Sequence, residues 1–339
     1  MAKWWSVRRR ITKHFSLPRP AQKRATGERG RLAAMPDRLT TLEKKNPHPM
    51  DARIRYVDST HKYYLDGNEL PISITGVIHD LFPQFDAAAT INKYFDNWSV
   101  DKNNKYHPLI AYLRIVRGLP DDDIKREIAT LWSSSGTAAS EAGTTMHAEI
   151  EAFENDGVVP ADKSKEYLQY EQWKQRPEVS GWTIHRTEWS IYNEPARVAG
   201  QVDALYRDAL GEYIMCDWKR CDPTPRRAGG PLELLGPDMD CFGKETGYGP
   251  CAHLPNTKFG HYCVQQNLYS GILSTLYGTP VTRMYLVQLH PKLNAAHMVQ
   301  VPHMPEMAAK IFADRILGLR VSPAPKRARV AEEGGGAGA

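Results

Sequence analysis

The sequence predicts an α/β protein of the α+β kind, in which helices flank a mixed central β-sheet. Hydrophobic residues make up 41% of the 339 residues, which is enough for a sizeable core. In the second half of the chain, the apolar residues follow a helical period, then three strand-like segments, then a helical period and a further strand. Successive strands that are followed by a helix and another strand favour a mixed sheet covered by helices. The predicted core order is therefore αβββαβ.

The elements of this core are assigned in chain order. A helix is expected at 138–154, and strands are expected at 183–192, 198–206 and 212–219. A long loop at 220–256 precedes a helix at 261–276, strands at 282–289 and 297–301, and a helix at 306–319.

Upstream of the core, residues 53–64 alternate in polarity, and Asp66-Gly67 is typical of a tight hairpin turn. A helix is expected to begin near Thr75, and 86–131 is expected to form several helices, one of them at 121–132. The chain is thus divided into a disordered basic arm at 1–50, a hairpin and helical region at 51–130, the core at 131–320 and a disordered tail at 321–339.

The net charge of +5 is concentrated at the two ends of the chain. Residues 1–27 hold eight Lys and Arg and no acidic residue, and 325–330 read PKRARV. Basic ends on a near-neutral body favour an anionic partner, nucleic acid first, and solvated disordered tails have the same composition. The C-terminal motif predicts a nuclear location, and a mitochondrial presequence or a viral factory also fits the tails.

The composition excludes several classes of protein. No run of about 18 apolar residues exists, so we expect no membrane-spanning helix. The N-terminus lacks the apolar stretch of a secretory signal. The five cysteines are odd in number and form no CxxC pair, which favours a reducing compartment over a disulfide framework. No GxxxxGK[ST] motif is present, so we do not expect the chain to unwind DNA by ATP hydrolysis.

Two charged residues near the end of the third expected strand are candidates for catalysis. Asp217 and Lys219 are two apart, so on a strand they project from the same face. The carboxylate can bind a divalent metal, and the ammonium can stabilise charge on a phosphate or orient an attacking water. The second strand supplies Asp203, which a hairpin places beside Asp217, and Gly200, which allows close backbone approach. Two converging carboxylates predict a hard cation, Mg²⁺ or Mn²⁺.

The flanking helices add further candidates. His147 and Glu151 are four apart and share a helix face, and an imidazole ligand favours Mn²⁺. Gln265 and Tyr269 are also four apart, and such a pair can reach a phosphate or a base edge. Glu188 on the first strand can add a carboxylate. Each feature alone also fits a structural role, as a salt bridge, a cap or a helix surface. Their order along one chain favours a single metal site.

The ordered motifs resemble the RecB-like branch of the PD-(D/E)XK nuclease superfamily over about residues 130–320. They are GTTMH at 143–147, GQVD at 200–203, DWK at 217–219 and QQNLY at 265–269. More loosely, YYLDG at 63–67, SIT at 73–75 and FPQFD at 82–86 look like nucleases of large DNA viruses of eukaryotes.

This resemblance implies a restriction-endonuclease-like core and a DNA exonuclease that uses a metal-activated water. It implies that the metal ligands are His147, Asp203, Asp217 and the backbone carbonyl of Trp218. Lys219 would be catalytic, and Thr144, Gln265 and Tyr269 would contact DNA. Asp217 stands where many relatives have Glu. No cysteine precedes Cys216, so the iron–sulfur cluster of some relatives is not expected.

Several alternatives stay open. The same site serves an endonuclease on flapped or branched DNA, a non-catalytic DNA-binding protein on a nuclease fold, or an RNA nuclease. Zinc held by Cys221, Cys241, Cys251 and His253 has irregular spacing, so free thiols are expected there.

Overall fold

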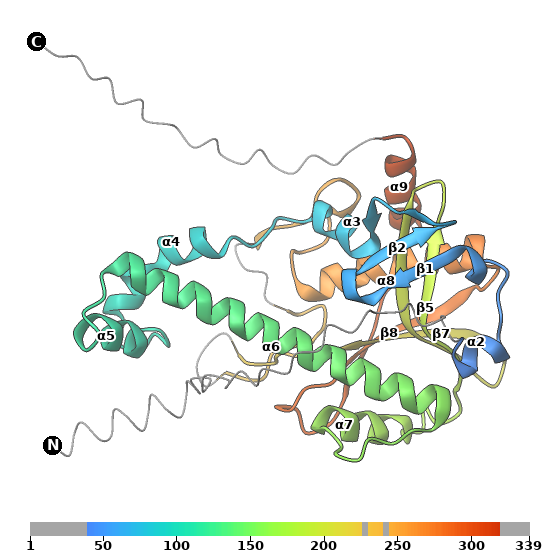
Figure 1. Ribbon diagram of the computed structural model, residues 1–339, viewed down its shortest axis with the longest axis horizontal. Helices are drawn as coiled ribbons and strands as arrows, with labels where there is room; N and C mark the ends of the chain where they lie inside the picture. Colours follow the sequence, from blue (N-terminus) through green and yellow to red (C-terminus); the bar gives the residue numbers. More distant parts are fainter. Residues whose placement is uncertain (1–38, 226–229, 240–243, 319–339) are drawn as a thin grey trace, which may run out of the picture. The chain divides into compact units, whose positions relative to one another are not determined.

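The computed structural model describes residues 39–225, 230–239 and 244–318 (Figure 1). Most of the predicted basic arm, the tail at 321–339 with its PKRARV motif, and Cys241 lie outside the described residues. The described chain forms two compact units, one of 85–140 and one of 39–84 with the residues that follow 140. Within the described residues, no helix is both long and apolar enough to span a membrane.

A mixed sheet forms the centre of the larger unit, as predicted. Its strand order is β4-β6-β7-β8-β9, and β5 pairs with β6 outside this path. β6 is antiparallel to β5 and β7 and parallel to β4, whereas β7 is parallel to β8 and β8 is antiparallel to β9. The strands are β4 (Ile72–Ser73), β5 (Thr183–Asn193), β6 (Val198–Arg207), β7 (Tyr213–Lys219), β8 (Val281–Gln288) and β9 (His297–Gln300). The five longer strands lie within one residue of their predicted ends.

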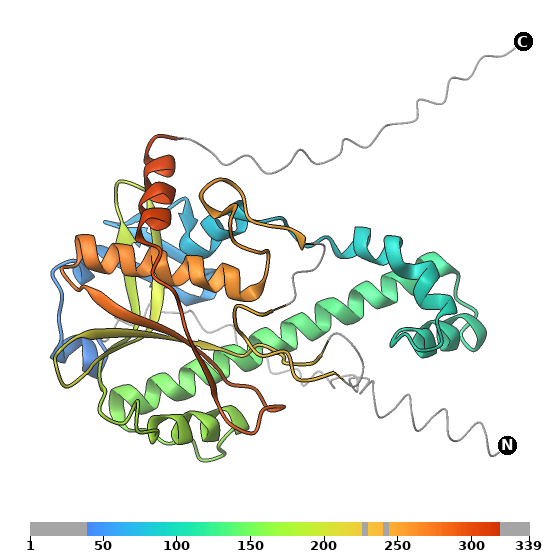
Figure 2. The same ribbon diagram turned by 180° about the vertical axis from the view of Figure 1, so that it is seen from behind.

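Side chains from the two faces of this sheet enter two separate cores, because successive residues of a strand point to opposite faces. On β7, Met215 joins one core, and its neighbours Ile214 and Cys216 join the other. Figures 1 and 2 show α8 on one side of the sheet and α7 on the other. The first core contains residues of α3 (Ile74–Leu81), α8 (Lys258–Leu276) and α9 (Pro305–Ile316), all three of which were predicted.

The second core contains residues of α6 (Asp121–Asp156) and α7 (Lys165–Lys174). The prediction of separate helices at 121–132 and 138–154 is wrong, because α6 is continuous. Small residues at 133–140 interrupt the apolar period, but seven of the eight are Ala, Ser or Thr, which do not break a helix, and all eight positions are exposed. α7 was not predicted. It buries Glu166 and Gln169 beside three aromatic residues and exposes Leu168, so polar and apolar residues do not separate onto two faces that would mark its period.

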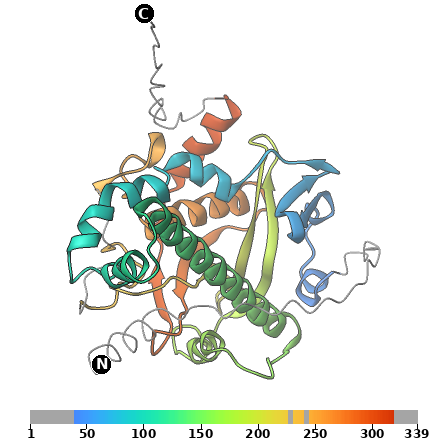
Figure 3. The same cartoon turned by 60° about the vertical axis from the view of Figure 1, so that its left-hand side comes forward.

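A small antiparallel sheet precedes the core. It consists of β1 (Ile54–Val57), β2 (Lys62–Leu65) and β3 (Asn68–Glu69). Asp66 and Gly67 have φ values of 48° and 80°, which confirms the predicted tight turn. Figure 3 shows β1 and β2 beside β5, and β1 contacts that strand. Short 3₁₀ helices lie at Asp51–Arg53, Asp58–Thr60 and Gly249–Cys251.

The arm predicted at 1–50 extends too far, because its last residues are folded. They form α2 (Thr41–Lys45), which begins with a capping box between Thr40 and Glu43. The Thr41 hydroxyl donates a hydrogen bond to Asp156 at the end of α6. α2 therefore belongs to the folded larger unit.

The smaller unit is helical, as predicted for 86–131. It contains α4 (Ala87–Val100), α5 (His107–Ile115) and the first part of α6. Its own hydrophobic core includes Ile91, Phe95, Ile110, Ile124 and Ile128. The division at 85 and 140 differs from the predicted boundary at 130/131, since the hairpin region packs with the sheet.

Candidate metal centre

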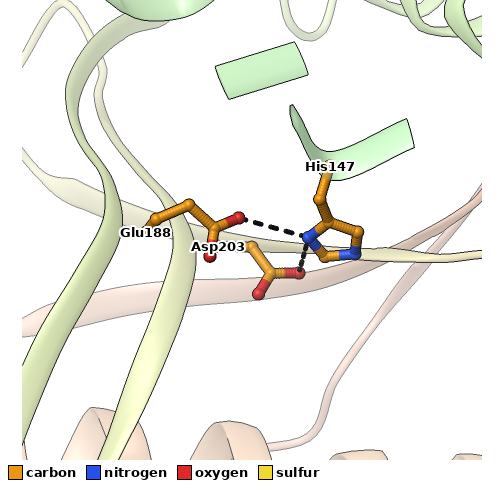
Figure 4. Close-up of side chains that lie close together, drawn as sticks. All are labelled: His147, Glu188 and Asp203. Carbon is orange, nitrogen blue, oxygen red and sulfur yellow. Dashed lines mark hydrogen bonds and ion pairs between the residues drawn. The ribbon is translucent and has the colours of Figure 1, made fainter. Parts of the chain in front are cut away.

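Three side chains that could hold a metal ion converge from a helix and two strands. His147 lies on α6, Glu188 on β5 and Asp203 on β6 (Figure 4). One ligand atom from each lies within 4.8 Å of the others. Glu188, which the sequence offered only as an additional acid, is thus a full member of this group.

The backbone around Asp203 and Glu188 explains why both carboxylates point to one place. The β6–β7 ladder begins at Ala204↔Cys216, directly beyond Asp203, whose Oδ2 accepts a hydrogen bond of 2.9 Å from the Trp218 amide. Glu188 falls opposite Asp203, since the flanking pairs are Thr187↔Ala204 and Trp189↔Val202.

Glu188 has φ of 42°, a left-handed conformation that costs a non-glycine residue about 1 kcal/mol. In this conformation the Glu188 side chain reaches His147 (Figure 4). Backbone strain of this kind concentrates at functional sites.

His147 has polar partners at both ring nitrogens. Its Nδ1 lies 3.2 Å from Glu188 Oε1 and 3.7 Å from Asp203 Oδ2. Its Nε2 lies 3.1 Å from the Trp218 carbonyl oxygen, which can only accept, so Nε2 is assigned as a donor. Burial lowers the pKa of His147, but the charges of Asp203 and Glu188 more than offset this effect and raise its pKa to about 9. The metal-free imidazole is therefore protonated near neutral pH.

Asp217 and Lys219 project from the same face of β7, as the spacing predicted, and they form a buried ion pair beside this group. Asp217 Oδ2 lies 2.5 Å from Lys219 Nζ, and only 1% of the Asp217 side chain is exposed. No hydrogen bond from the described residues satisfies either Asp217 oxygen beyond this ion pair. Burial and the charge of Asp203 raise the pKa of Asp217, whereas the pKa of Lys219 is raised by both carboxylates against its own burial.

Helix α8 places Gln265 and Tyr269 next to the strands. Gln265 Nε2 donates to the Tyr269 hydroxyl over 3.2 Å, and the buried Gln265 Oε1 has no partner among the described residues. A Cβ atom added at Gly200 would lie 2.5 Å from a ring carbon of Tyr269. This contact explains why β6 has glycine at this position, as the sequence suggested.

Other predicted residues lie near the centre without joining the ligand group. Thr144 is exposed on α6, and Glu151 is half-buried one helical turn beyond His147. Burial, and then the charge of Glu43, raise the pKa of Glu151. Direct coordination by Asp217 and by the Trp218 carbonyl stays a prediction.

Tyr262 on α8 was not predicted. Its ring centroid lies 4.6 Å from Lys219 Nζ. It precedes Gln265 by three residues and Tyr269 by seven, so the helical period of that pair, extended by one turn, would have identified it.

The donor set fits a small divalent cation. Carboxylate oxygens suit Mg²⁺ and Mn²⁺, and an imidazole nitrogen favours Mn²⁺. Asp217 Oδ2 already faces Lys219 Nζ at 2.5 Å, whereas the buried Asp217 Oδ1 has no hydrogen-bond partner among the described residues and can also face a cation. In the described part of the chain, the His147 group is the one cluster of potential ligands. Cys216, Cys221, Cys251 and Cys263 are buried, free thiols.

Two comparisons with known proteins, one with family models and one with curated proteins, found no match. What the centre can do therefore follows from its own residues and geometry.

Proposed function

We propose that this protein is a metal-dependent nuclease that hydrolyses DNA phosphodiesters, and that it acts as an exonuclease. The observation that carries the proposal is the ligand group of His147, Glu188 and Asp203, which adjoins the buried Asp217–Lys219 pair. A bound cation and a positioned cationic side chain at one place accelerate hydrolysis of a phosphodiester, because both stabilise the negative charge that builds up on the phosphate.

Each residue of the centre has a role in this scheme. His147, Glu188 and Asp203 would hold Mg²⁺ or Mn²⁺. The cation, when bound, lowers the pKa of water and neutralises charge on the scissile phosphate. Lys219 would direct its ammonium group at a phosphate oxygen or at the attacking water, and Asp217 holds that ammonium group from one side. Attack of the water on phosphorus would break the bond to the 3′-oxygen, so the products would be a 5′-phosphate and a 3′-hydroxyl.

Two residues of α8 are the candidates for contact with a nucleic-acid substrate. Gln265 carries a buried oxygen without a partner in the described structure, and its pair Tyr269 lies against Gly200 on β6. These two residues would hold the DNA strand. The order of elements from α6 through β5, β6, β7 and α8 to β8 supports membership of the RecB-like PD-(D/E)XK branch, with its restriction-endonuclease-like core.

Cleavage assays on linear and covalently closed circular DNA, single- and double-stranded, test this proposal. Each substrate is incubated with Mg²⁺, Mn²⁺ or EDTA. The wild-type protein is compared with Lys219→Ala and with Lys310→Ala, which removes an exposed lysine of α9. We expect metal-dependent loss of linear DNA with the wild type and the Lys310 variant and none with the Lys219 variant.

The other outcomes are also informative. Cleavage of circles would replace the exonuclease assignment with an endonuclease. Cleavage of RNA alone would change the substrate. Full cleavage by Lys219→Ala, or no cleavage of any substrate by the wild type, would refute the proposed site.

A further inference from the structure

The ammonium group of Lys219 is enclosed on two sides. Asp217 Oδ2 lies 2.5 Å away on the same strand. The ring of Tyr262, on α8, also lies next to the ammonium group, with its centroid 4.6 Å from Nζ. The Lys219 side chain keeps 14% of its surface exposed, so part of it remains accessible.

Tyr262 is itself fixed by its surroundings. Its hydroxyl lies 3.6 Å from Cys221 Sγ, and the Cys221 carbonyl accepts a hydrogen bond of 2.9 Å from the buried side chain of Gln288 on β8. Burial raises the pKa of Tyr262, so its ring stays neutral and its hydroxyl stays protonated. The ring, which α8 carries, is thus fixed by a contact with the segment that follows β7.

A protonated lysine amine has three N–H donors and rotates freely unless its neighbours prevent it. Asp217 alone attracts one donor and leaves the amine free to swing about that contact. A ring face next to the amine is attractive to it, because the face of an aromatic ring is electron-rich, and this attraction is stronger in a site shielded from water. Together the two contacts leave a restricted set of directions for the remaining donor.

We propose that Tyr262 is a positioning residue for Lys219: its ring face, together with the Asp217 contact, directs the free donor of the ammonium group toward the substrate. This inference rests on the proposed nuclease function and adds a residue to it. Tyr262 acts through Lys219, and its ring does the positioning. Its hydroxyl serves to fix the ring.

Three variants separate the ring from the hydroxyl and from packing. Tyr262→Leu removes the ring, and Tyr262→Phe keeps the ring and removes the hydroxyl. Phe259→Leu is the matched control, because Phe259 is a buried aromatic residue of the same helix that packs in the first core. Steady-state cleavage of labelled DNA gives kcat and KM, and thermal unfolding shows that each variant is folded.

We expect Tyr262→Leu to lower kcat by roughly 10-fold with little change in KM, since the lost contact orients a group in the transition state. Tyr262→Phe should recover most of kcat, and Phe259→Leu should keep wild-type kcat. Wild-type kcat in Tyr262→Leu would overturn the inference. An equal loss of kcat in the Phe and Leu variants would overturn it too, because the hydroxyl would then be responsible.

A second measurement does not depend on cleavage. The lysine side-chain methylene protons next to Nζ lie near the Tyr262 ring, so NMR of lysine-labelled protein should show one ring-current-shifted resonance, assigned by its absence in Lys219→Arg. This shift should persist in Tyr262→Phe and disappear in Tyr262→Leu. Its absence in the wild type would overturn the proposed contact. An inactive wild type with the shift intact would instead refute the nuclease function on which the inference rests.

Discussion

His147 links metal binding to pH at the scale of one residue. Its pKa is about 9, since Asp203 and Glu188 more than offset the effect of burial. A metal ligand must be deprotonated, so we expect metal binding to release a proton between pH 7 and 8, and metal affinity to rise as pH approaches 9. Titration calorimetry of Mn²⁺ binding in two buffers with different ionisation enthalpies measures this release. Binding without proton release would contradict the prediction, and His147→Asn is the control that removes it.

The raised pKa of His147 also determines how its contribution to the stability of the folded protein changes with pH. A histidine whose pKa is raised on folding stabilises the folded protein fully below its unfolded pKa of about 6.5. In the metal-free protein this contribution is lost as pH rises through about 9.

The Asp217–Lys219 pair gives a second prediction at this scale. Lys219→Met leaves a buried carboxylate without its partner, which typically costs about 3–5 kcal/mol. The loss of free energy of unfolding should be larger at pH 8 than at pH 5. Burial raises the pKa of Asp217, so more of this carboxyl is protonated at pH 5, and a protonated carboxyl needs no cation. Urea unfolding of the metal-free protein at both pH values measures it.

The double variant Asp217→Asn, Lys219→Met completes that experiment. It removes both charges, so it should recover most of the lost free energy of unfolding while cleavage stays absent. An equal loss at both pH values, or no recovery in the double variant, would show that the pair is not a buried charge pair.

At the scale of the element, the approach of β6 to α8 depends on one glycine. Gly200→Ala would place Cβ 2.5 Å from the Tyr269 ring, and overpacking of this kind costs about 1–3 kcal/mol. The free energy of unfolding should fall accordingly, and cleavage should fall with it because Tyr269 is displaced. Gly136→Ala in α6 is the matched control, because no atom lies within 4 Å of its added Cβ.

The control Gly136→Ala should change the free energy of unfolding in the opposite direction from Gly200→Ala. Alanine in an exposed helix is about 1 kcal/mol more favourable than glycine, so Gly136→Ala should stabilise the protein. The variant Gly200→Ala, Tyr269→Leu should lose less stability than the sum of its single changes, since the smaller side chain relieves the clash. Strict additivity would mean that the two residues are not in contact.

The elements also show where sequence patterns stop being informative. β5 to β8 carry apolar residues at strand-like spacing, so their ends could be predicted. α7 could not, because it buries Glu166 and Gln169 together with aromatic residues. The break predicted in α6 was wrong. Its run of small residues has no periodic apolar positions, but the helix propensity of these residues is high enough to continue the helix.

For the site, the hairpin of β6 and β7 placed Asp203 near Asp217 from sequence alone. The membership of Glu188 depends on its left-handed φ, and the contact of Tyr262 with Lys219 depends on how α8 packs on the sheet. Both are set by tertiary packing, which residue spacing does not encode. Residue spacing therefore predicted most residues of the centre, but it did not predict that Glu188 is a full member of the ligand group.

At the scale of the whole molecule, the two units have separate hydrophobic cores. Ile128 lies in the core of the helical unit, and the sheet of the larger unit has its own two cores. Cores that share few contacts unfold as separate cooperative units. Ile128→Ala should therefore reduce the stability of the helical unit by about 2–5 kcal/mol, since it leaves a cavity at a fully buried position.

Hydrogen exchange measured by mass spectrometry tests this separation. In Ile128→Ala, amides of α4 and α5 should exchange faster, whereas those of β6 and β7 should keep their wild-type protection. The matched variant Ile214→Ala, in the second core, should show the reverse pattern. Mn²⁺ binding should survive in Ile128→Ala, because its three proposed ligands all belong to the larger unit. Equal loss of protection in both units would show that the chain unfolds as one cooperative body despite its separate cores.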